Sequence, residues 1–491
     1  MLITIKLFKI VVVVSSFMKN RFRTNIKRSV IVGMASCMLL ACSSTSELDK
    51  DIRNIDLPAN WQESKEKLHV QNDWLNQLDN PQVKQLVKSA ISSNHQLKIQ
   101  AYNVEIQQQQ LIVSGSTLWP SLDFSLRSGR SRNNATEIYS NSSSIDLDLS
   151  YELDLWGKLT AADQQANLTF MAAQSNFEQS KQQLVVDVVT TWFAVVEAEK
   201  LLSLYESRVK NSQQNLDIIE SGYNSGLSAA LDVYLTRNEL NSELTRVSEQ
   251  RSTKTKLIRQ LERLVGEYPE GKLLVDADLP LLTSDIPLGL PSELISRKPE
   301  LMASWYELLA KDAGVAFAHK QRFPSLSLTA SLGDSSSDIS DLLSGSSLAW
   351  SLFGNLSAPL FNAGRLEANE EKARLSLKQG EQFYLDDLYT AFSKVENAIT
   401  QEKNLKNSYQ SMLAAQENAK IAATLSFEQY QSGLVEYTTV LDAQSRSFDA
   451  QSTLIQIKNR LIANRIQLHL ALGGDFSVSD ESATTPKVKA E

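Results

Sequence analysis

Cysteine is almost absent from this 491-residue chain, and the only two, Cys37 and Cys42, lie near the N-terminus. The rest of the chain therefore contains no disulfide, no thiolate metal site and no cysteine nucleophile. The four histidines are scattered without the spacing of metal ligands. With only 18 glycines and 11 prolines, the chain is expected to form long, uninterrupted secondary-structure elements.

Positive charge is scarce outside the N-terminal region. The chain contains 49 Lys and Arg against 57 Asp and Glu, but residues 1–41 hold seven of the basic residues and no acid. The remaining chain therefore carries a net charge of −15. Because binding along nucleic acid requires Lys and Arg to replace the counterions of the phosphates, we predict no nucleic-acid partner.

No group of residues indicates catalysis, and we predict that the protein is not an enzyme and has no metal or nucleotide cofactor. Residues 266–272 fit most of the phosphate-binding loop pattern. However, Leu273 replaces the Ser or Thr that would hold Mg²⁺, and Glu267 and Glu270 would repel phosphate. The segment also follows a predicted helix, whereas a phosphate-binding loop follows a strand.

The first 41 residues have the pattern of a secretory signal. Basic residues in 19–28 precede an apolar run that is too short to span a bilayer. Met18 would start a conventional signal, so residues 1–17 are a candidate upstream mis-start.

Residues 39–42 read Leu-Leu-Ala-Cys and resemble the bacterial lipobox. The resemblance implies that Cys42 carries a covalent lipid, the only attached group expected, and becomes the first mature residue. Ser43 follows, and in bacterial lipoproteins a residue other than Asp there favours the outer membrane. Several acyl chains, each contributing about 0.8 kcal/mol per buried CH₂, would anchor the N-terminus. The alternative is ordinary signal cleavage.

The chain contains a tandem duplication of a unit of roughly 200 residues. Three short motifs recur in the same order, at an offset of 204 residues for the first and 207 for the others. The recurring segments are 119–122 with 323–326, 153–158 with 360–365, and 223–227 with 430–434.

Each copy contains two predicted strands. Apolar and polar residues alternate along 144–155, which predicts a strand with one apolar and one acidic face. The acids on that face are Asp146, Asp148, Glu152 and Asp154. The other predicted strands are at 121–128, 326–332 and 348–360, with exposed loops at 129–143 and 333–347.

After Gly157 and Gly364 the hydrophobic period becomes helical. The segment from Gly157 to Gly222 contains no intervening Gly or Pro, and about 65 helical residues give a rod of roughly 100 Å. Two neighbouring apolar seams predict that this helix packs on both flanks. The seams are Val185, Val188, Trp192 and Val195, and Val186, Val189, Phe193 and Val196; Leu385, Leu388, Phe392, Val395 and Ile399 repeat the pattern in the second copy. Second helices are predicted at about 228–265 and 435–472.

A strand with one apolar and one acidic face suits lipid on one side and water on the other. Four strands cannot close a cylinder, and an open edge in hydrocarbon would leave backbone groups unpaired at several kcal/mol each. The membrane interpretation therefore predicts a barrel assembled from several chains by rotational symmetry. The alternative is a soluble sheet packed against protein, with its acidic face in solvent.

These features together resemble the TolC-type outer-membrane efflux factors, and more narrowly their lipoprotein branch, which serves resistance-nodulation-division exporters. The resemblance rests on four features: the lipobox, the duplicated hairpin-and-helix unit, the Tyr-x-x-Gly-Leu turns and the Pro-Ser-Leu segments at which strands begin. Segment 287–300 is similar to the linker of that branch, and the match covers about 70–475. The resemblance implies a mixed α and β membrane protein: a homotrimer whose twelve strands form an outer-membrane barrel continuous with a long periplasmic α-helical barrel.

The predicted division of the chain follows the duplication. It comprises a signal at 1–41, a lipidated N-terminus and first periplasmic helix at 42–118, barrel hairpins at 119–157 and 323–363, long helical pairs at 158–270 and 364–474, a linker and helix at 271–322, and a disordered tail at 475–491.

The resemblance implies a passive duct that exports small molecules such as drugs and toxic compounds, joined by a periplasmic adaptor protein to an inner-membrane pump. Alternatives are type I protein secretion, metal efflux, or a lipid-anchored coiled-coil spacer without a pore. The exported compound and the particular pump are not encoded in recognisable motifs.

In the family the Gly-Leu turns are the periplasmic tips that meet the adaptor. The resemblance therefore implies adaptor contacts by Gly226, Leu227, Gly433 and Leu434. The alternative is that the two leucines only cap the helix ends. Glycine at these turns can adopt the positive φ that reverses the chain.

The resemblance also implies gate residues. Asp232 aligns with an acid that, in the family, hydrogen-bonds to the tyrosine that aligns with Tyr430 and so holds the tip closed. Asp442 aligns with an acid that forms a ring at the narrowest point of the channel. This sequence departs from some members at Val435, which replaces a locking Arg, and at Thr439, which replaces a further Asp, so the lock is expected to be weaker. The alternative role of both acids is to stabilise a helix N-terminal turn.

Overall fold

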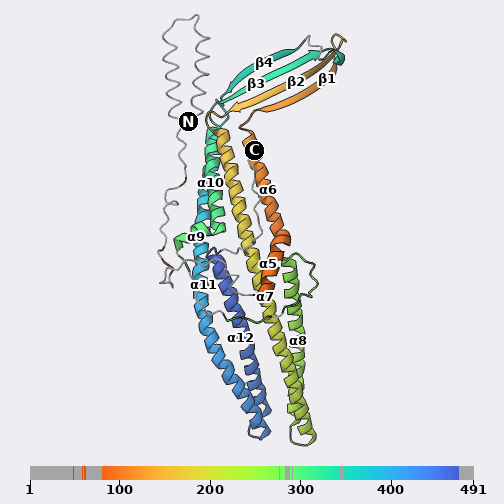
Figure 1. Cartoon of the computed structure of the whole chain (residues 1–491), viewed down its shortest axis with the longest axis vertical. Coiled ribbons are helices and arrows are strands. Elements are labelled where there is room, and N and C mark those ends of the chain that lie inside the picture. Colours follow the sequence, from red (N-terminus) through yellow and green to blue (C-terminus); the bar gives the residue numbers. More distant parts are fainter. Residues whose placement is uncertain are drawn as a thin grey trace.

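The structure is a computed structural model and describes residues 48, 58, 60, 61, 80–275, 277–281, 288, 289, 291–342 and 347–474. The predicted signal, the predicted lipidation site Cys42 and the predicted disordered tail lie outside the described residues. The chain forms a long rod of helices with a β-sheet at one end (Figure 1).

Three pairs of helices have equal lengths in the two copies of the repeat, which confirms the duplication. The pairs, of 67, 35 and 22 residues, are α7 (Lys158–Asn224) with α11 (Arg365–Gln431), α8 (Ala230–Leu264) with α12 (Tyr437–Ala471), and α6 (His95–Ser116) with α10 (Pro299–Lys320). Two shorter helices are α5 (Pro81–Ser93) and α9 (Pro291–Arg297). At 1.5 Å per residue, α7 and α11 are each about 100 Å long, as the sequence predicts.

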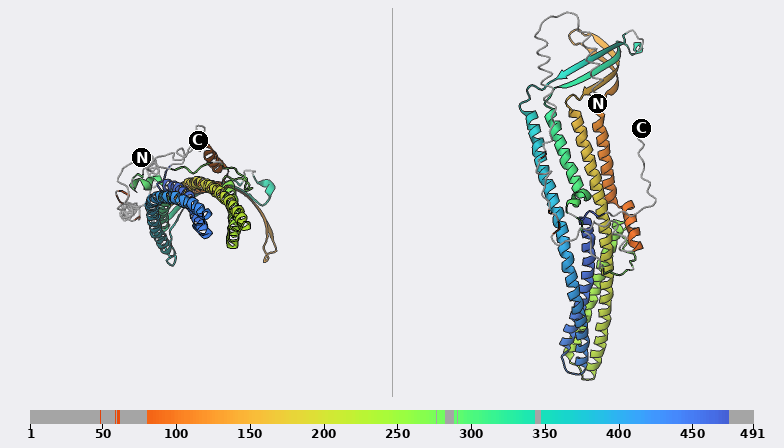
Figure 2. Two further views of the ribbon diagram at one scale, coloured as in Figure 1. Left: turned by 90° about the horizontal axis from the view of Figure 1, so that it is seen from below. Right: turned by 60° about the vertical axis from the view of Figure 1, so that its left-hand side comes forward.

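The helices form a curved layer. Near the sheet, the packing order is α6, α7, α10 and α11, and toward the far end α8 and α12 pack beside α7 and α11. Seen from below, the layer has a concave and a convex side, and α5 and α9 lie on the convex side (Figure 2). Among the described residues, no helix has the length and apolar composition needed to cross a bilayer.

The two apolar seams of α7 are buried, with no member more than 2% exposed. This confirms that α7 packs on both flanks, because α5, α6, α8, α10 and α12 all contact it. In α11 the expectation is only partly correct: Leu388 and Val395 are fully buried, but Leu385 and Phe392 are only partly buried. The reason is that α11 forms the edge of the helix layer, where its main helical neighbours in the described part of the chain are α10 and α12.

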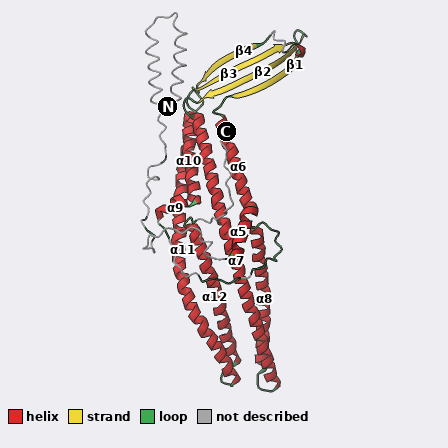
Figure 3. Ribbon diagram, viewed as in Figure 1, coloured by secondary structure: helices red, strands yellow, loops and turns green. Residues whose placement is uncertain are grey.

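The four predicted strands form one antiparallel sheet in the order β1-β2-β3-β4 (Figure 3). The strands are β1 (Ser121–Arg132), β2 (Tyr139–Leu153), β3 (Ser325–Ser336) and β4 (Ala349–Ser357). Leu147 of β2 lies opposite Phe124 of β1 and Leu332 of β3, which makes one face continuously apolar. The outer edges of β1 and β4 pair with no described strand.

The predicted loops at 129–143 and 333–347 are too long. β1 and β2 remain paired up to Arg132 and Tyr139, and β3 extends to Ser336. Serine and asparagine suggest loops in isolation, but cross-strand contacts override that preference. The hydroxyls of Ser128 and Ser143 lie 3.0 Å apart, and the Arg130 guanidinium stacks over the Tyr139 ring at 4.4 Å.

Candidate functional site

The polar face of the sheet gathers carboxylates. Asp148 of β2 lies opposite Asp123 of β1 and Ser331 of β3, and Asp146 lies two residues along the same face. Sequence reasoning missed Asp123, although its position between Leu122 and Phe124 places it on the polar side of a period-two pattern.

The other two predicted sheet acids have local partners. Glu152 forms an ion pair with Lys158, with 2.5 Å between Oε1 and Nζ. Asp154 lies beyond the end of β2, which corrects its assignment to the strand. Its carboxylate accepts hydrogen bonds from the backbone N–H groups of Leu159 and Thr160, at 2.9 and 2.8 Å. Asp154 therefore caps the first turn of α7, where a negative charge is favoured.

The two Gly-Leu turns lie together at the end of the rod farthest from the sheet (Figure 1). Gly226 and Gly433 have φ values of 75° and 71°, which favour glycine and end α7 and α11. The side chains of Leu227 and Leu434 are 85% and 74% exposed. They therefore do not pack against the helix ends within this chain, and both are available to a partner.

A polar contact joins the two repeats just above these turns. The Tyr430 hydroxyl donates to the Asp232 carboxylate at 3.2 Å and lies 3.3 Å from the Ser228 hydroxyl. Burial, with the nearby Asp232 charge, raises the pKa of Tyr430, so the donated proton is retained. The hydrogen bond implied by the family resemblance is thus present, whereas Ser228 was not anticipated. We call Tyr430, Asp232 and Ser228 the tip lock.

Apolar packing supports the tip lock. Ile219 of α7, Val233 of α8, and Tyr437 and Val440 of α12 form a buried cluster beside it. The Tyr430 and Tyr437 rings lie 5.2 Å apart between centroids. Because both repeats contribute, separating the tips would expose this cluster to water.

Farther from the tip, Arg208 of α7 is only 2% exposed and forms a second polar connection between the repeats. It pairs with the buried Glu243 of α8 at 2.6 Å and stacks over Phe448 of α12 at 4.5 Å, with Asp449 4.0 Å away. Burial raises the pKa of Glu243 to about 7, although Arg208 opposes the rise. Sequence reasoning missed this cluster, because an isolated charge on a long helix is ordinarily solvated.

Asp442 is exposed near the start of α12, and its carboxylate accepts a hydrogen bond from Arg446 at 2.9 Å. The two residues are one helical turn apart. Arg446 was not anticipated, and it compensates part of the negative charge of Asp442, which the family resemblance implies to be part of a ring. Thr439 is exposed in the first turn of the same helix, and Val435 lies half-buried in the preceding turn.

In the segment that resembles a phosphate-binding loop, a carboxylate of the protein occupies the position that a phosphate would take. The backbone N–H groups of Gly271, Lys272 and Leu273 donate to the buried Glu262 carboxylate at 2.6, 2.9 and 3.2 Å. These three donors are therefore already used within the chain. In the described part of the chain, no three His, Cys, Asp or Glu side chains are placed to hold a metal ion.

Comparison with known proteins agrees with this geometry. The family model described as outer membrane efflux protein matches residues 86–267 and 290–474. The chain is 31% identical over 414 residues to the solvent efflux pump outer membrane protein SrpC of Pseudomonas putida, covering 81% of this chain and 86% of the relative. It is 27% identical over 413 residues to the probable outer membrane lipoprotein SilC of Salmonella typhimurium, covering 82% and 88%.

The fold is also similar to a solved structure. The crystal structure of the Campylobacter jejuni CmeC outer membrane channel superposes with a TM-score of 0.79 at 23% identity, covering 89% of this chain and 94% of that one. At this identity the match supports the arrangement of helices and strands alone.

Proposed function

The chain belongs to the outer membrane efflux protein family, and we propose that it forms the exit duct of a tripartite efflux pump in a Gram-negative outer membrane. The duct is passive, and its energy comes from an inner-membrane pump to which a periplasmic adaptor joins it. The exposed Leu227 and Leu434, on turns made by Gly226 and Gly433, are the proposed adaptor contacts. The observation that carries the proposal is the pair of open edges on the sheet and the helix layer.

Among the elements that the structure describes, the β-sheet and the helix layer each have two unpaired edges, and these edges lie on the same two sides of the molecule. The sheet ends at β1 and β4, and the neighbouring helix layer ends at α6 and α11. On α6, Ile99, Tyr102 and Ile106 follow helical spacing and are 54–62% exposed; on α11, Phe383 and Tyr389 are 58% and 62% exposed. The β1/α6 margin of one copy can therefore pack on the β4/α11 margin of the next, and a repeated contact of this kind closes a ring.

We propose that three copies close this ring. Twelve strands then form an outer-membrane barrel, and the helices continue it as a periplasmic tunnel. Exposed apolar side chains such as Phe124 and Trp350, which are 66% and 78% exposed in the single chain, face lipid in this arrangement. Asp123, Asp146 and Asp148 face the water-filled interior and attract cations.

We expect purified protein in nanodiscs to have the native mass of three copies and to form cation-preferring channels in planar bilayers. Asp123→Asn with Asp148→Asn should lower the cation preference, because three such pairs surround the pore. Native mass spectrometry and reversal potentials in a salt gradient measure both properties, with Asp341→Asn in the β3–β4 connection as a control. A monomer without channels would disprove the duct, and an anion-selective wild type would disprove the acidic interior.

The position of Leu48 supports a lipid on Cys42. Leu48 is 5% exposed and packs with Leu308 and Val315 of α10 and with Leu377 and Tyr384 of α11. Val315 precedes the sheet-proximal end of α10 by five residues, or about 8 Å. The six residues from Cys42 to Leu48 can span up to about 20 Å, so the lipid can reach the level of the sheet.

We expect mature protein from cells fed an alkyne analogue of palmitate to carry the label. Cys42→Ser should abolish the label, because Cys42 is the proposed acyl acceptor, whereas the matched variant Cys37→Ser should retain it. Mass spectrometry of the N-terminal peptide identifies the modified residue. Labelling that persists in Cys42→Ser would contradict the assignment.

A further inference from the structure

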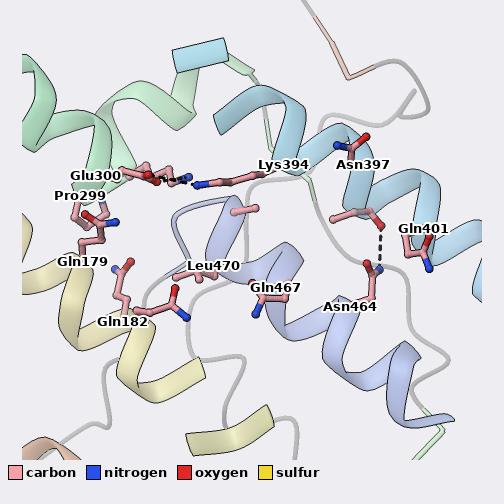
Figure 4. A pocket seen from close by; sticks show the side chains of 14 residues that line it. Gln179, Gln182, Pro299, Glu300, Lys394, Asn397, Gln401, Asn464, Gln467 and Leu470 are labelled. Atoms are coloured by element: carbon pink, nitrogen blue, oxygen red, sulfur yellow. Dashed lines mark hydrogen bonds and ion pairs between the residues drawn. The ribbon is translucent and has the colours of Figure 1, made fainter. Parts of the chain in front are cut away.

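A cavity of about 520 Å³ lies midway along the rod, where α10 begins and α12 ends (Figure 4). Its walls come from α7, α10, α11 and α12, so both repeats contribute to it. The tip lock and the sheet acids do not line it.

We infer from the positions of its lining residues that the cavity faces the concave side of the helix layer. On the convex side, Phe392 of α11 packs against Trp61, which belongs to the same buried cluster as Leu294 of α9. Gln401, which lines the cavity, is nine residues after Phe392 and therefore lies half a turn around α11 from it. No residue of α5 or α9, which cover the convex side, belongs to the lining (Figure 2).

One wall carries two lysine ammonium groups, those of Lys298 and Lys394. The Nζ of Lys298, whose residue is 5% exposed, lies 2.8 Å from one carboxylate oxygen of Glu300, and the Nζ of Lys394 lies 3.4 Å from the other. Although burial opposes ionisation, the two lysines hold the pKa of Glu300 below its usual value. The Asp387 carboxylate of α11 also acts on Lys298, so two ammonium groups stand against two carboxylates. The half-exposed Lys394 is the ammonium group at the cavity (Figure 4).

The remaining lining combines side-chain amides that have no hydrogen-bond partner among the described residues with an apolar surface. The side-chain amides of Gln179, Gln182, Gln401 and Gln467 line the cavity, and none bonds to another residue that the structure describes. Each amide provides both donors and an acceptor. Pro299, Leu470 and Ala471 supply apolar surface between them. This combination suits a small molecule with an apolar body and an anionic end.

The duplication provides an internal comparison. A second cavity of about 730 Å³ lies at the corresponding junction of α6 and α8. At the repeat offset, Lys394 corresponds to Asp187 and Lys298 to Asn94, both of which line the second cavity. The two lysines therefore line the second-repeat cavity and not the first-repeat one.

We propose that the cavity bounded by Lys394 and the four glutamines binds amphipathic carboxylates. This inference rests on the proposed duct, in which the concave side is the inner wall and the ligand is a compound in transit. The Lys394 ammonium pairs with the carboxylate, the glutamine amides bond its polar atoms, and the apolar floor contacts its body.

Equilibrium dialysis of the nanodisc-embedded protein at low ionic strength tests the site with 1-naphthoate and 1-naphthylmethylammonium, which share a ring system but differ in charge. We expect naphthoate to bind at least about tenfold more tightly, because a charge-assisted contact is lost with the amine. Lys394→Gln should remove this difference. Gln467→Leu, at an exposed position, should weaken naphthoate binding independently.

Arg263→Gln, in the second cavity, is the matched control and should leave naphthoate binding unchanged, with empty nanodiscs as the blank. Equal binding of the two probes, full binding by Lys394→Gln, or loss of binding in Arg263→Gln would overturn the proposal. The native mass and the channel conductance of the same preparations are also measured. Channel-forming trimers that do not bind naphthoate would refute this site alone, whereas a failed duct would appear as monomers without conductance.

Discussion

Tyr430→Phe combined with Asp232→Asn is expected to raise the single-channel conductance of the purified protein in planar bilayers. The double variant removes the donor and the charged acceptor of the 3.2 Å hydrogen bond that joins the two repeats at the tip. A hydrogen bond to a charged group contributes enough free energy that its loss shifts the ratio of open to closed tips by about tenfold or more. In the proposed trimer, each of the three copies would lose this restraint.

The duplication supplies the control. Tyr223 corresponds to Tyr430 and Thr439 to Asp232 at the repeat offset, but no described residue forms a side-chain hydrogen bond with either. Tyr223→Phe with Thr439→Val should therefore leave conductance at the wild-type level. If the tip-lock variant also conducts like the wild type, the closed tip depends instead on the apolar cluster around Ile219 and Tyr437.

Arg208→Met is expected to destabilise the helical rod near the tip by about 3–5 kcal/mol. Arg208 and Glu243 are 2% and 1% exposed, so the substitution leaves a carboxylate buried without its closest positive partner. Arg208→Met with Glu243→Leu should recover most of this loss, because an apolar pair of similar size needs no compensating charge. Thermal unfolding and amide hydrogen exchange in α7, α8 and α12 measure the effect.

The pH dependence follows from the same residue. Burial raises the pKa of Glu243 from 4.5 to about 7, so between these values the folded state holds more protons than the unfolded state. The stability contributed by this protonation is complete below about pH 4.5 and is lost as the pH rises through about 7. The other charges facing the site are Glu239 and Arg246 of α8 and Asp449 of α12.

Removing Arg208 raises the pKa of Glu243 further, because Arg208 is the largest influence that lowers it. The destabilisation caused by Arg208→Met should therefore be larger at pH 8 than at pH 5. The Arg208→Met, Glu243→Leu variant should lose this difference between the two pH values. A stability penalty that is the same at both would show that Glu243 does not titrate in the folded chain.

Features that depend on local repetition were predictable from the sequence. The alternation along 144–155 predicts a half-buried strand because side chains alternate faces in any strand. The seams of α7 predict a helix packed on both flanks because positions three and four residues apart share a face. The duplication then extends each prediction to the second copy. The turns at the glycines were predictable because glycine readily adopts the positive φ that such a turn requires.

Features that depend on distant residues meeting were not predictable. Arg208 and Glu243 resemble solvated charges until α8 folds back along α7, and the carboxylate-binding cavity exists only where α10 meets α12. Asp154 alternates with its neighbours as a strand residue would, yet the turn into α7 ends the strand before it. The sequence by itself determined which elements form, because periodicity is local. Only the tertiary structure decided which polar groups are buried together, because the free energy of a charge depends on surroundings that the chain supplies from many residues away.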